Sequence, residues 1–489
     1  MGHEFEQRKQ AGYSLIASNV NELFLIFKCT NLNVSIKWSN FNILFMPSDF
    51  CLFIRNARIL LPSGEFFIGD VQTNGREIVQ VAPELPVSTV NGTTQEIDAK
   101  GLTLLPGVID PQVHFREPGL EHKEDLFTAS CACAKGGVTS FLEMPNTRPL
   151  TITQEALDDK LRRAADKCIV NYGFFIGATP ENFPDVLDAQ PTCGIKVFMG
   201  SMHGQLLIDR EEVLEPIFAK GTRLIAVHAE DQARINQRRE EFAGITDPAI
   251  HSQIQDNQAA LNATQLALKL SKKYQRRLHI LHLSTAEEAE LLRQDKPSWV
   301  TAEVTPQHLL LNTSAYEKIG TLAQMNPPLR SPHDNQVLWQ ALLDGVIDFI
   351  ATDHAPHTLE EKAKGYPNTP SGMPGVETSL PLMLTQAMQG RCSVVQVSNW
   401  MSTAVAQAYG IPKKGAIAPG YDADLVLVDL DNYRPVLREE LFTKCGWSPF
   451  EGWELTGWPV ITIVGGQVVY DRGQLNTEVR GQALTFNNC

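Results

Sequence analysis

Five residues of types found in metal centres each lie near the end of a different short apolar segment. They are His114, Lys196, His228, His282 and Asp353. If the five segments end at the same place in the fold, these side chains converge on one site. Such a convergence from five segments would be an improbable accident, so we interpret the chain as a metal-dependent hydrolase.

The segments that carry these residues belong to a set of eight apolar runs between Leu102 and His357. The runs are LTLLPGVID, GVTSFLEMP, VNYGFFIG, GIKVFMG, LIAVHAE, RLHILHLS, VTAEVTP and DFIATDHAPH. Amphipathic stretches rich in Ala, Leu, Glu and Lys separate most of them. Eight strands alternating with helices predict an α/β fold, a (β/α)8 TIM barrel, whose active site forms at the carboxyl ends of the strands.

Short β-strand patterns flank the predicted barrel on both sides. Residues 51–105 alternate predicted short strands and turns. The same alternation occurs near the end of the chain, in GYDADLVLVDL and GWPVITIVGGQVVYDRGQL. We therefore predict a small β-sandwich built from both flanks, residues 47–106 and 413–489, around a barrel of residues 107–412. The Gly- and Pro-rich loop 358–375 follows strand eight, and we expect it to cover the mouth of the active site.

Composition narrows the class of protein. The 489 residues accommodate one barrel of roughly 250–300 residues with an accessory domain. A net charge of -14 argues against nucleic acid as a partner, because phosphate binding needs clustered Lys and Arg. No apolar run of about 20 residues predicts a membrane helix, and nine cysteines without regular spacing are typical of reduced thiols in a cytoplasmic protein.

Residues 1–46 stand apart from this organisation. They mix apolar and polar residues without a cleavage-site pattern, so we do not expect a signal peptide. A regular domain begins just after Met46, at CLFIRNARILLP. Our preferred explanation is a translation start placed too far upstream, and a genuine extra module is the alternative.

The end of the first barrel strand makes the interpretation more specific. Asp110, Gln112 and His114 are two apart, so their side chains share one face of a strand and look into the barrel. PGVIDPQVHFREPG, FLEMPNT, MNPPLR, DFIATDHAPH, SGMPGVETSLPL and GYDADLVLVD occur in this order. Together they resemble the dihydroorotases of the amidohydrolase superfamily over about residues 51–475. The chain departs from that family at Gln112, which stands where the usual first histidine would be.

The resemblance implies two zinc ions bridged by a carboxylated lysine. His114 would bind the first ion together with Asp353, Lys196 would be the bridge, and His228 and His282 would bind the second ion. A buried lysine loses its proton easily, and reaction with CO2 makes it a carbamate anion that can bridge two cations. The alternative is a lysine that extends to solvent or pairs with an acid.

Gln112 alters the expected number of metal ions. Its neutral amide oxygen is a poorer zinc ligand than imidazole. The first ion would rest on His114, Asp353 and the bridge, and would bind weakly or only with substrate. The alternative is a one-metal enzyme in which Gln112 is a hydrogen-bonding residue outside the ligand set. We therefore expect one or two zinc ions per chain.

The other histidines are expected to lie outside the ligand set. His279 and His282 are three apart and face opposite sides of their strand, so we choose His282 as the ligand and expect His279 to be packed. By the same parity His354 points away from Asp353. We interpret three further histidines as loop or surface residues, namely His251, His308 and His333.

Substrate recognition follows from the charge of the family's substrate, which carries a carboxylate. Arg116 lies two residues beyond His114 on the same face and is the natural bidentate partner. Asn146 and His357 match the family's other carboxylate contacts, and Asn326 would bind the ring amide. Among smaller departures, Gln324 occupies a position where a lysine is frequent in the family.

The resemblance implies reversible cyclisation of N-carbamoyl-aspartate to dihydroorotate, a step of pyrimidine synthesis, with Asp353 as the catalytic proton shuttle. Two alternatives stay open. One is an allantoinase or hydantoinase on the same barrel. The other is a metal-poor homologue that serves as a scaffold for aspartate transcarbamoylase. We expect a homo-oligomer that acts on a small molecule and has aspartate transcarbamoylase as a possible partner.

Overall fold

The computed structural model describes residues 50–86, 94–202 and 204–487, together with the backbone of three strands near the N-terminus. The chain divides into two compact units, Met1–Ser48 and Asp49–Cys489. The first unit holds an antiparallel sheet in the order β1-β2-β3, with β1 at Tyr13–Asn19, β2 at Glu22–Cys29 and β3 at Leu32–Ser35. The predicted status of residues 1–46 stays a prediction.

Parallel strands form the centre of the second unit. One sheet has the order β11-β10-β9 and another the order β12-β13-β14-β15-β16-β17, and every strand pair in both is parallel. Their bounds are β9 Val108–Val113, β10 Val138–Glu143, β11 Asn171–Phe174, β12 Ile176–Gly177, β13 Ile195–Phe198, β14 Ile225–His228, β15 Leu278–Ile280, β16 Val300–Val304 and β17 Phe349–Ile350. The α/β class was thus predicted, and each of the eight predicted runs contains all or part of one of these strands, except VNYGFFIG, which contains both β11 and β12.

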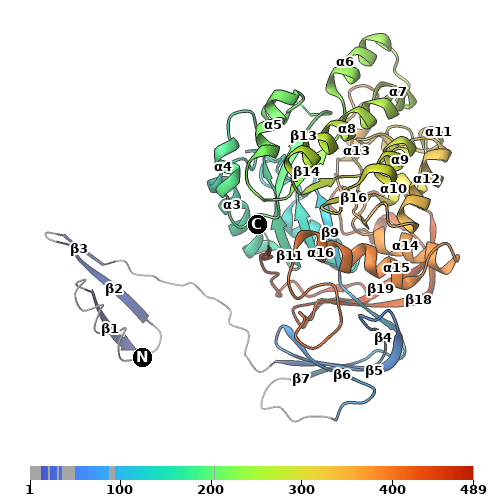
Figure 1. Ribbon diagram of the computed structural model, residues 1–489. Helices are drawn as coiled ribbons and strands as arrows, with labels where there is room; N and C mark the ends of the chain where they lie inside the picture. The colour runs from blue at the N-terminus through green and yellow to red at the C-terminus, as the bar shows by residue number, and fades with distance from the viewer. Residues whose placement is uncertain are drawn as a thin grey trace. The chain divides into compact units, whose positions relative to one another are not determined.

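Helices follow each parallel strand except β11 and lie around the outside of the parallel strands (Figure 1). The longer ones are α2 Leu126–Lys135, α3 Gln154–Lys167, α5 Glu211–Ala219, α6 Gln232–Glu241, α8 Asn257–Tyr274, α9 Ala286–Asp295, α12 Pro332–Leu343 and α14 Ser379–Met388. Local sequence explains where several begin. Asp125, Thr285 and Ser331 each cap a helix and complete a reciprocal capping box with the residue three positions later.

Short helices occupy the loops. They are α4 Phe183–Asp188, α7 His251–Ile254, α10 Pro306–Leu310, α11 Ala315–Ile319, α13 Leu359–Lys362, α15 Val394–Ser398 and α16 Ala404–Tyr409. No helix among the described residues is both long and apolar enough to cross a membrane.

Both flanks of the parallel core contribute to one nine-stranded sheet. Its order is β21-β20-β19-β18-β8-β4-β5-β6, with β7 paired to β4. The strands from the first flank are β4 Cys51–Leu60, β5 Phe66–Asn74, β6 Glu77–Ala82, β7 Thr94–Asp98 and β8 Thr103–Pro106. Those from the second are β18 Leu425–Pro435, β19 Glu454–Val464, β20 Gln467–Asp471 and β21 Gln474–Leu475. The two flanks meet where β8 pairs antiparallel with β18.

The run LTLLPGVID, predicted as one strand, is divided in the structure. Its first half is β8 in the nine-stranded sheet, and its second half begins β9 in the parallel sheet. Gly107 lies between them, where an added Cβ would fall 2.2 Å from the Thr139 side chain. A residue without a side chain therefore permits the chain to pass from one sheet to the other.

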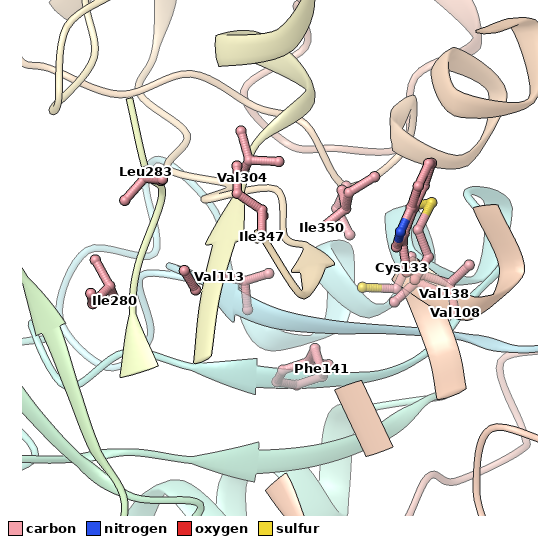
Figure 2. Packing of buried hydrophobic residues seen from close by; sticks show 14 of the residues in the cluster. Val108, Val113, Cys133, Val138, Phe141, Ile280, Leu283, Val304, Ile347 and Ile350 are labelled. Atoms are coloured by element: carbon pink, nitrogen blue, oxygen red, sulfur yellow. The ribbon is translucent and has the colours of Figure 1, made fainter. Parts of the chain in front are cut away.

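Apolar side chains from many strands and helices form the largest buried cluster. Val113 of β9, Phe141 of β10, Ile280 of β15, Val304 of β16 and Ile350 of β17 all belong to it (Figure 2). Because both faces of parallel strands are covered, these strands are buried along nearly their whole length. The rigid core fixes the strand ends, and these ends carry the candidate site.

Candidate active site

A cavity of about 110 Å³ lies beyond the carboxyl ends of the parallel strands. Eight of the nine predicted site residues line it: His114, Arg116, Asn146, Lys196, His228, His282, Asn326 and Asp353. Gln112 lines it as well. Residues from segments more than 200 positions apart therefore meet in one small space, as the strand-end argument requires.

His114 and Asp353 form one pair of potential ligands. His114 Nε2 lies 3.1 Å from Asp353 Oδ1, and His114 Nδ1 lies 2.7 Å from Asn146 Oδ1. Because an amide oxygen only accepts, the imidazole proton belongs on Nδ1 and the Nε2 lone pair faces the carboxylate. Burial lowers the pKa of His114, with Asp353 opposing that shift. Two acceptor atoms that face each other in this way suit a cation between them.

Gln112 binds Asp353 from the other side. Its Nε2 donates to Asp353 Oδ1 over 3.0 Å, while Oε1 is buried without a hydrogen-bond partner in the described part of the chain. The side chain thus uses its donor on the carboxylate and keeps its acceptor free. In this arrangement Gln112 stabilises the charge of Asp353, and only its Oε1 is available to a cation.

His228 and His282 form the second pair. His228 Nδ1 lies 2.8 Å from His282 Nε2, and His228 Nε2 lies 2.8 Å from Glu230 Oε2. Since the carboxylate accepts the Nε2 proton, the Nδ1 lone pair of His228 is directed toward His282. Glu230 is fully buried and also accepts a short hydrogen bond of 2.5 Å from Ser201 Oγ. Sequence reasoning missed Glu230, although its position two residues after His228 was a usable signal.

Lys196 lies in the same cavity without a hydrogen-bonding partner. The side chain is 0% exposed, and its Nζ is buried without a hydrogen-bonding partner among the described residues. The ring centroid of Phe198 lies 4.4 Å from Nζ. Burial lowers the pKa of Lys196 to about 7, with the charges of Asp353 and Glu303 opposing it. The amine is therefore readily neutral and nucleophilic, and the alternative of an acid-paired lysine has no hydrogen bond to support it.

Three site residues adopt left-handed backbone conformations that ordinary side chains avoid. The φ angles are +69° at Arg116, +36° at His282 and +47° at Asp353. Each such conformation costs roughly 1–3 kcal/mol and persists only when the surroundings enforce it. Each of the three residues follows a parallel strand, so the turns after β9, β15 and β17 direct these side chains into the cavity.

Arg116 is buried and held from behind by His357. Arg116 Nε donates to Pro356 O over 3.1 Å, and Nη2 lies 3.2 Å from His357 Nε2. Lys123 Nζ donates to His357 Nδ1 over 3.0 Å, so the imidazole proton lies on Nε2 and is donated to Ser371 O, 3.0 Å away. The Arg116 guanidinium therefore packs against this nitrogen without a hydrogen bond to it. His357 is the one predicted site residue that does not line the cavity. It supports Arg116 and Ser371 instead of facing the ligand.

Two histidines interpreted as loop or surface residues are buried, and that interpretation was wrong. His251 is 5% exposed, and its Nε2 lies 2.8 Å from Asn326 Oδ1. His308 is also buried, with Nε2 3.0 Å from Pro327 O. Both rings satisfy polar groups of the loop that contains Asn326, and local sequence cannot reveal such packing between loops. His333 is exposed, as predicted.

His279 and His354 lie where strand parity placed them. His279 stacks on Phe349, with ring centroids 4.8 Å apart, and bonds Glu303 over 3.0 Å. His279 is therefore packed, as predicted, and His282 lines the cavity. His354 Nδ1 accepts from Gly375 N over 3.1 Å and lies outside the cavity.

The ligand types fit a metal centre only in part. In the described ranges, no group of three or more His, Cys, Asp and Glu side chains is arranged to hold a metal ion. The side chains form two pairs, His114 with Asp353 and His228 with His282. A third ligand for either pair would have to come from Lys196 or Gln112, and the unpartnered Nζ and Oε1 atoms of these two residues are the groups available for it.

Comparison with known proteins places these features in a family. The model of the amidohydrolase family matches residues 103–469. A dihydroorotase of Methanosarcina acetivorans is 35% identical, over 88% of this chain and 92% of its own length. A dihydroorotase of Bacillus subtilis is 33% identical, over 86% and 99%. Among solved structures, an L-hydantoinase (dihydropyrimidinase) from Arthrobacter aurescens superimposes with a TM-score of 0.83 at 31% identity, over 89% of this chain and 99% of its own.

Proposed function

Because the chain belongs to the amidohydrolase family, and its similar curated relatives are dihydroorotases, we propose that it hydrolyses the cyclic amide of dihydroorotate reversibly to N-carbamoyl-aspartate. One observation supports this function most. Two pairs of ligand-type side chains flank the unpartnered Lys196 in a cavity that also contains a buried arginine. The pairs suit hydrolysis of an amide, and the arginine suits a substrate that carries a carboxylate.

The proposed site requires the parallel strands to close into a (β/α)8 barrel. Support comes from both seams between the two parallel sheets. His114 N donates to His354 O over 2.7 Å, and Val113 forms a parallel bridge with His354, which joins the end of β9 to the segment after β17. At the other seam, the chain passes from β11 to β12 through Phe175, whose N donates to Glu143 O of β10 over 2.9 Å, and Cys193 N, just before β13, donates to Phe174 O of β11 over 3.1 Å. Bonds at both seams support closure of the parallel strands.

We assign His114, Asp353, Lys196, His228 and His282 to a zinc centre of one or two ions, with Lys196 carboxylated. The low pKa and burial of Lys196 support the carboxylation, because the neutral amine is the form that attacks CO2. The pair His228–His282 has the better support, since Glu230 fixes the tautomer of His228. Gln112 weakens the case for an ion beside His114. Zinc bound here would lower the pKa of water and polarise the substrate carbonyl.

The chain's own residues supply binding and proton transfer. Arg116 and the amide nitrogen of Asn146 bind the substrate carboxylate, and Asn326 binds the ring amide. In the hydrolytic direction water attacks the ring carbonyl carbon, Asp353 accepts the proton, and the carbon–nitrogen bond of the ring breaks. Asp353 then delivers that proton to the departing nitrogen. Gln112 donates to Asp353 Oδ1 and orients the side chain for both transfers.

A hydantoinase is the second candidate, because hydantoinases are among the similar structures. Activity with dihydroorotate, hydantoin, dihydrouracil and allantoin should be measured in parallel on the zinc-loaded protein. We expect turnover of dihydroorotate to exceed that of the ring substrates without a carboxylate by about 10- to 150-fold, since a carboxylate–arginine pair contributes about 1.5–3 kcal/mol and uncharged rings leave Arg116 unpaired. Preference for hydantoin would favour the second candidate. Absence of all four activities would favour the scaffold that binds aspartate transcarbamoylase.

A further inference from the structure

One wall of the cavity consists of two loop segments. Residues 321–326 carry Asn326, and residues 369–373 carry Ser371 and Gly372, all of which line the cavity. The second segment lies against the end of β17. Ala355 N donates to Met373 O over 3.0 Å, and a Cβ on Gly372 would fall 2.5 Å from Ala355 O. We call these two segments the substrate wall.

Lys362, at the end of α13, joins both segments of the substrate wall. Its Nζ donates to Gln324 O over 2.9 Å, to Pro370 O over 3.0 Å and to Gly372 O over 3.0 Å. The backbone of the same residue contributes as well, because Lys362 O accepts hydrogen bonds from the hydroxyls of Thr321 over 2.7 Å and of Thr369 over 3.1 Å. One residue thus contacts both segments through its ammonium group and its carbonyl oxygen.

The chemistry of this contact requires a charged lysine. An ammonium group has three protons and no acceptor, so it satisfies three carbonyl oxygens at once. The side chain is 1% exposed, and burial lowers its pKa to about 7 without a carboxylate partner in the described part of the chain. A buried cation held only by carbonyl groups is costly unless those bonds are all made. Any apolar replacement removes a donor from all three carbonyl oxygens, and in the described part of the chain only that of Gln324 keeps another, the Gly372 N–H at 2.9 Å.

We propose that Lys362 is a positioning residue that holds the substrate wall in the place where Asn326, Ser371 and Gly372 face the substrate. The inference rests on the proposed function for its effect on substrate, but the contact itself does not. Lys362 touches neither the cavity nor the reacting atoms. Its loss therefore affects binding through the wall and leaves the proton transfers of Asp353 in place.

The test compares Lys362→Met with Lys364→Met, an exposed lysine two residues farther along the chain. Hydrogen exchange is measured by mass spectrometry on the zinc-loaded proteins without substrate. We expect exchange of peptides covering 321–326 and 369–376 to rise at least about tenfold in Lys362→Met, while peptides of β14 and β16 change less than about twofold. In steady-state kinetics with dihydroorotate, KM should rise at least about tenfold with kcat within about threefold. Lys364→Met should match the wild type in both measurements.

Unchanged exchange in the two wall segments would overturn the proposal, and so would an equal increase throughout the chain. If Lys362→Met does not fold, Gly372→Ala takes its place, because the added Cβ displaces the same wall. A wild-type KM in Gly372→Ala would then overturn the inference. An inactive wild type with locally raised exchange in Lys362→Met would refute the proposed function and leave the role of Lys362 standing.

Discussion

Replacing Gln112 by histidine tests how far the stability of the protein and its affinity for zinc depend on the Gln112 side-chain amide. Gln112 Nε2 donates to Asp353 Oδ1 over 3.0 Å, and a hydrogen bond to a charged group contributes about 1.5–3 kcal/mol. In the metal-free protein, Gln112→His should therefore lower the free energy of unfolding by much of that amount. With zinc present we expect the substitution to stabilise the protein instead, because imidazole is a better zinc ligand than an amide oxygen. We expect the Kd of the ion beside His114 to fall at least about tenfold, which is about 1.4 kcal/mol.

The assay has two parts and a matched control. Bound zinc is counted by mass spectrometry after dialysis against graded chelator, and the free energy of unfolding is measured in urea with and without zinc. Gln112→Leu is the control, since it removes the hydrogen bond without supplying a ligand and should lower both stability and zinc content. If wild type and Gln112→His each retain two zinc ions with equal resistance to chelator, the reasoning about Gln112 is refuted.

Three further outcomes are expected. Arg116→Ala should weaken dihydroorotate binding by about 2–4 kcal/mol, because it removes a buried charge-assisted pair, and Arg116→Lys should recover little of it; a wild-type KM in the alanine variant would exclude Arg116 from the site. Asp353→Asn should lower kcat on the order of a thousandfold with the fold intact by circular dichroism, and retention of more than about a tenth of the turnover would contradict the proton-shuttle role. Burial lowers the pKa of Lys196 to about 7, so the fraction of neutral amine should increase as pH rises through about 7. The yield of carbamate formed from 13C-bicarbonate, measured by NMR, should increase with it. A carbamate yield that falls over this range would contradict the assignment.

Strand periodicity predicted the part of the site that strands determine. Their positions near strand ends singled out His114, Lys196, His228 and His282, and parity separated His282 from His279. Their roles as ligands came from the family resemblance. The strand boundaries were less predictable. LTLLPGVID is divided at Gly107 because β8 finds a partner in β18, more than 300 residues away, and no local pattern encodes that partner.

The burial and the contacts of loop residues could not be predicted from the sequence. His251 and Lys362 lie in polar segments that resemble exposed loops, yet both are buried because several loops pack on one another above the strands. His357 shows the same limit for function. Its position after Asp353 suggested direct contact with substrate, whereas its partners are Lys123, Arg116 and Ser371. Burial and partner choice in such loops depend on tertiary contacts that have no period in the sequence.

The sheet shared by both flanks has a consequence for synthesis on the ribosome. Strand β8 is fully buried in the finished protein, but its neighbour β18 is made about 320 residues later, which at ordinary translation rates is a delay of roughly 15–60 s. During that time β8 presents an unpaired apolar edge while the helices and parallel strands emerge and fold. The nascent chain is therefore exposed to aggregation until its last hundred residues appear, and we expect its yield to depend on chaperones that cover such edges.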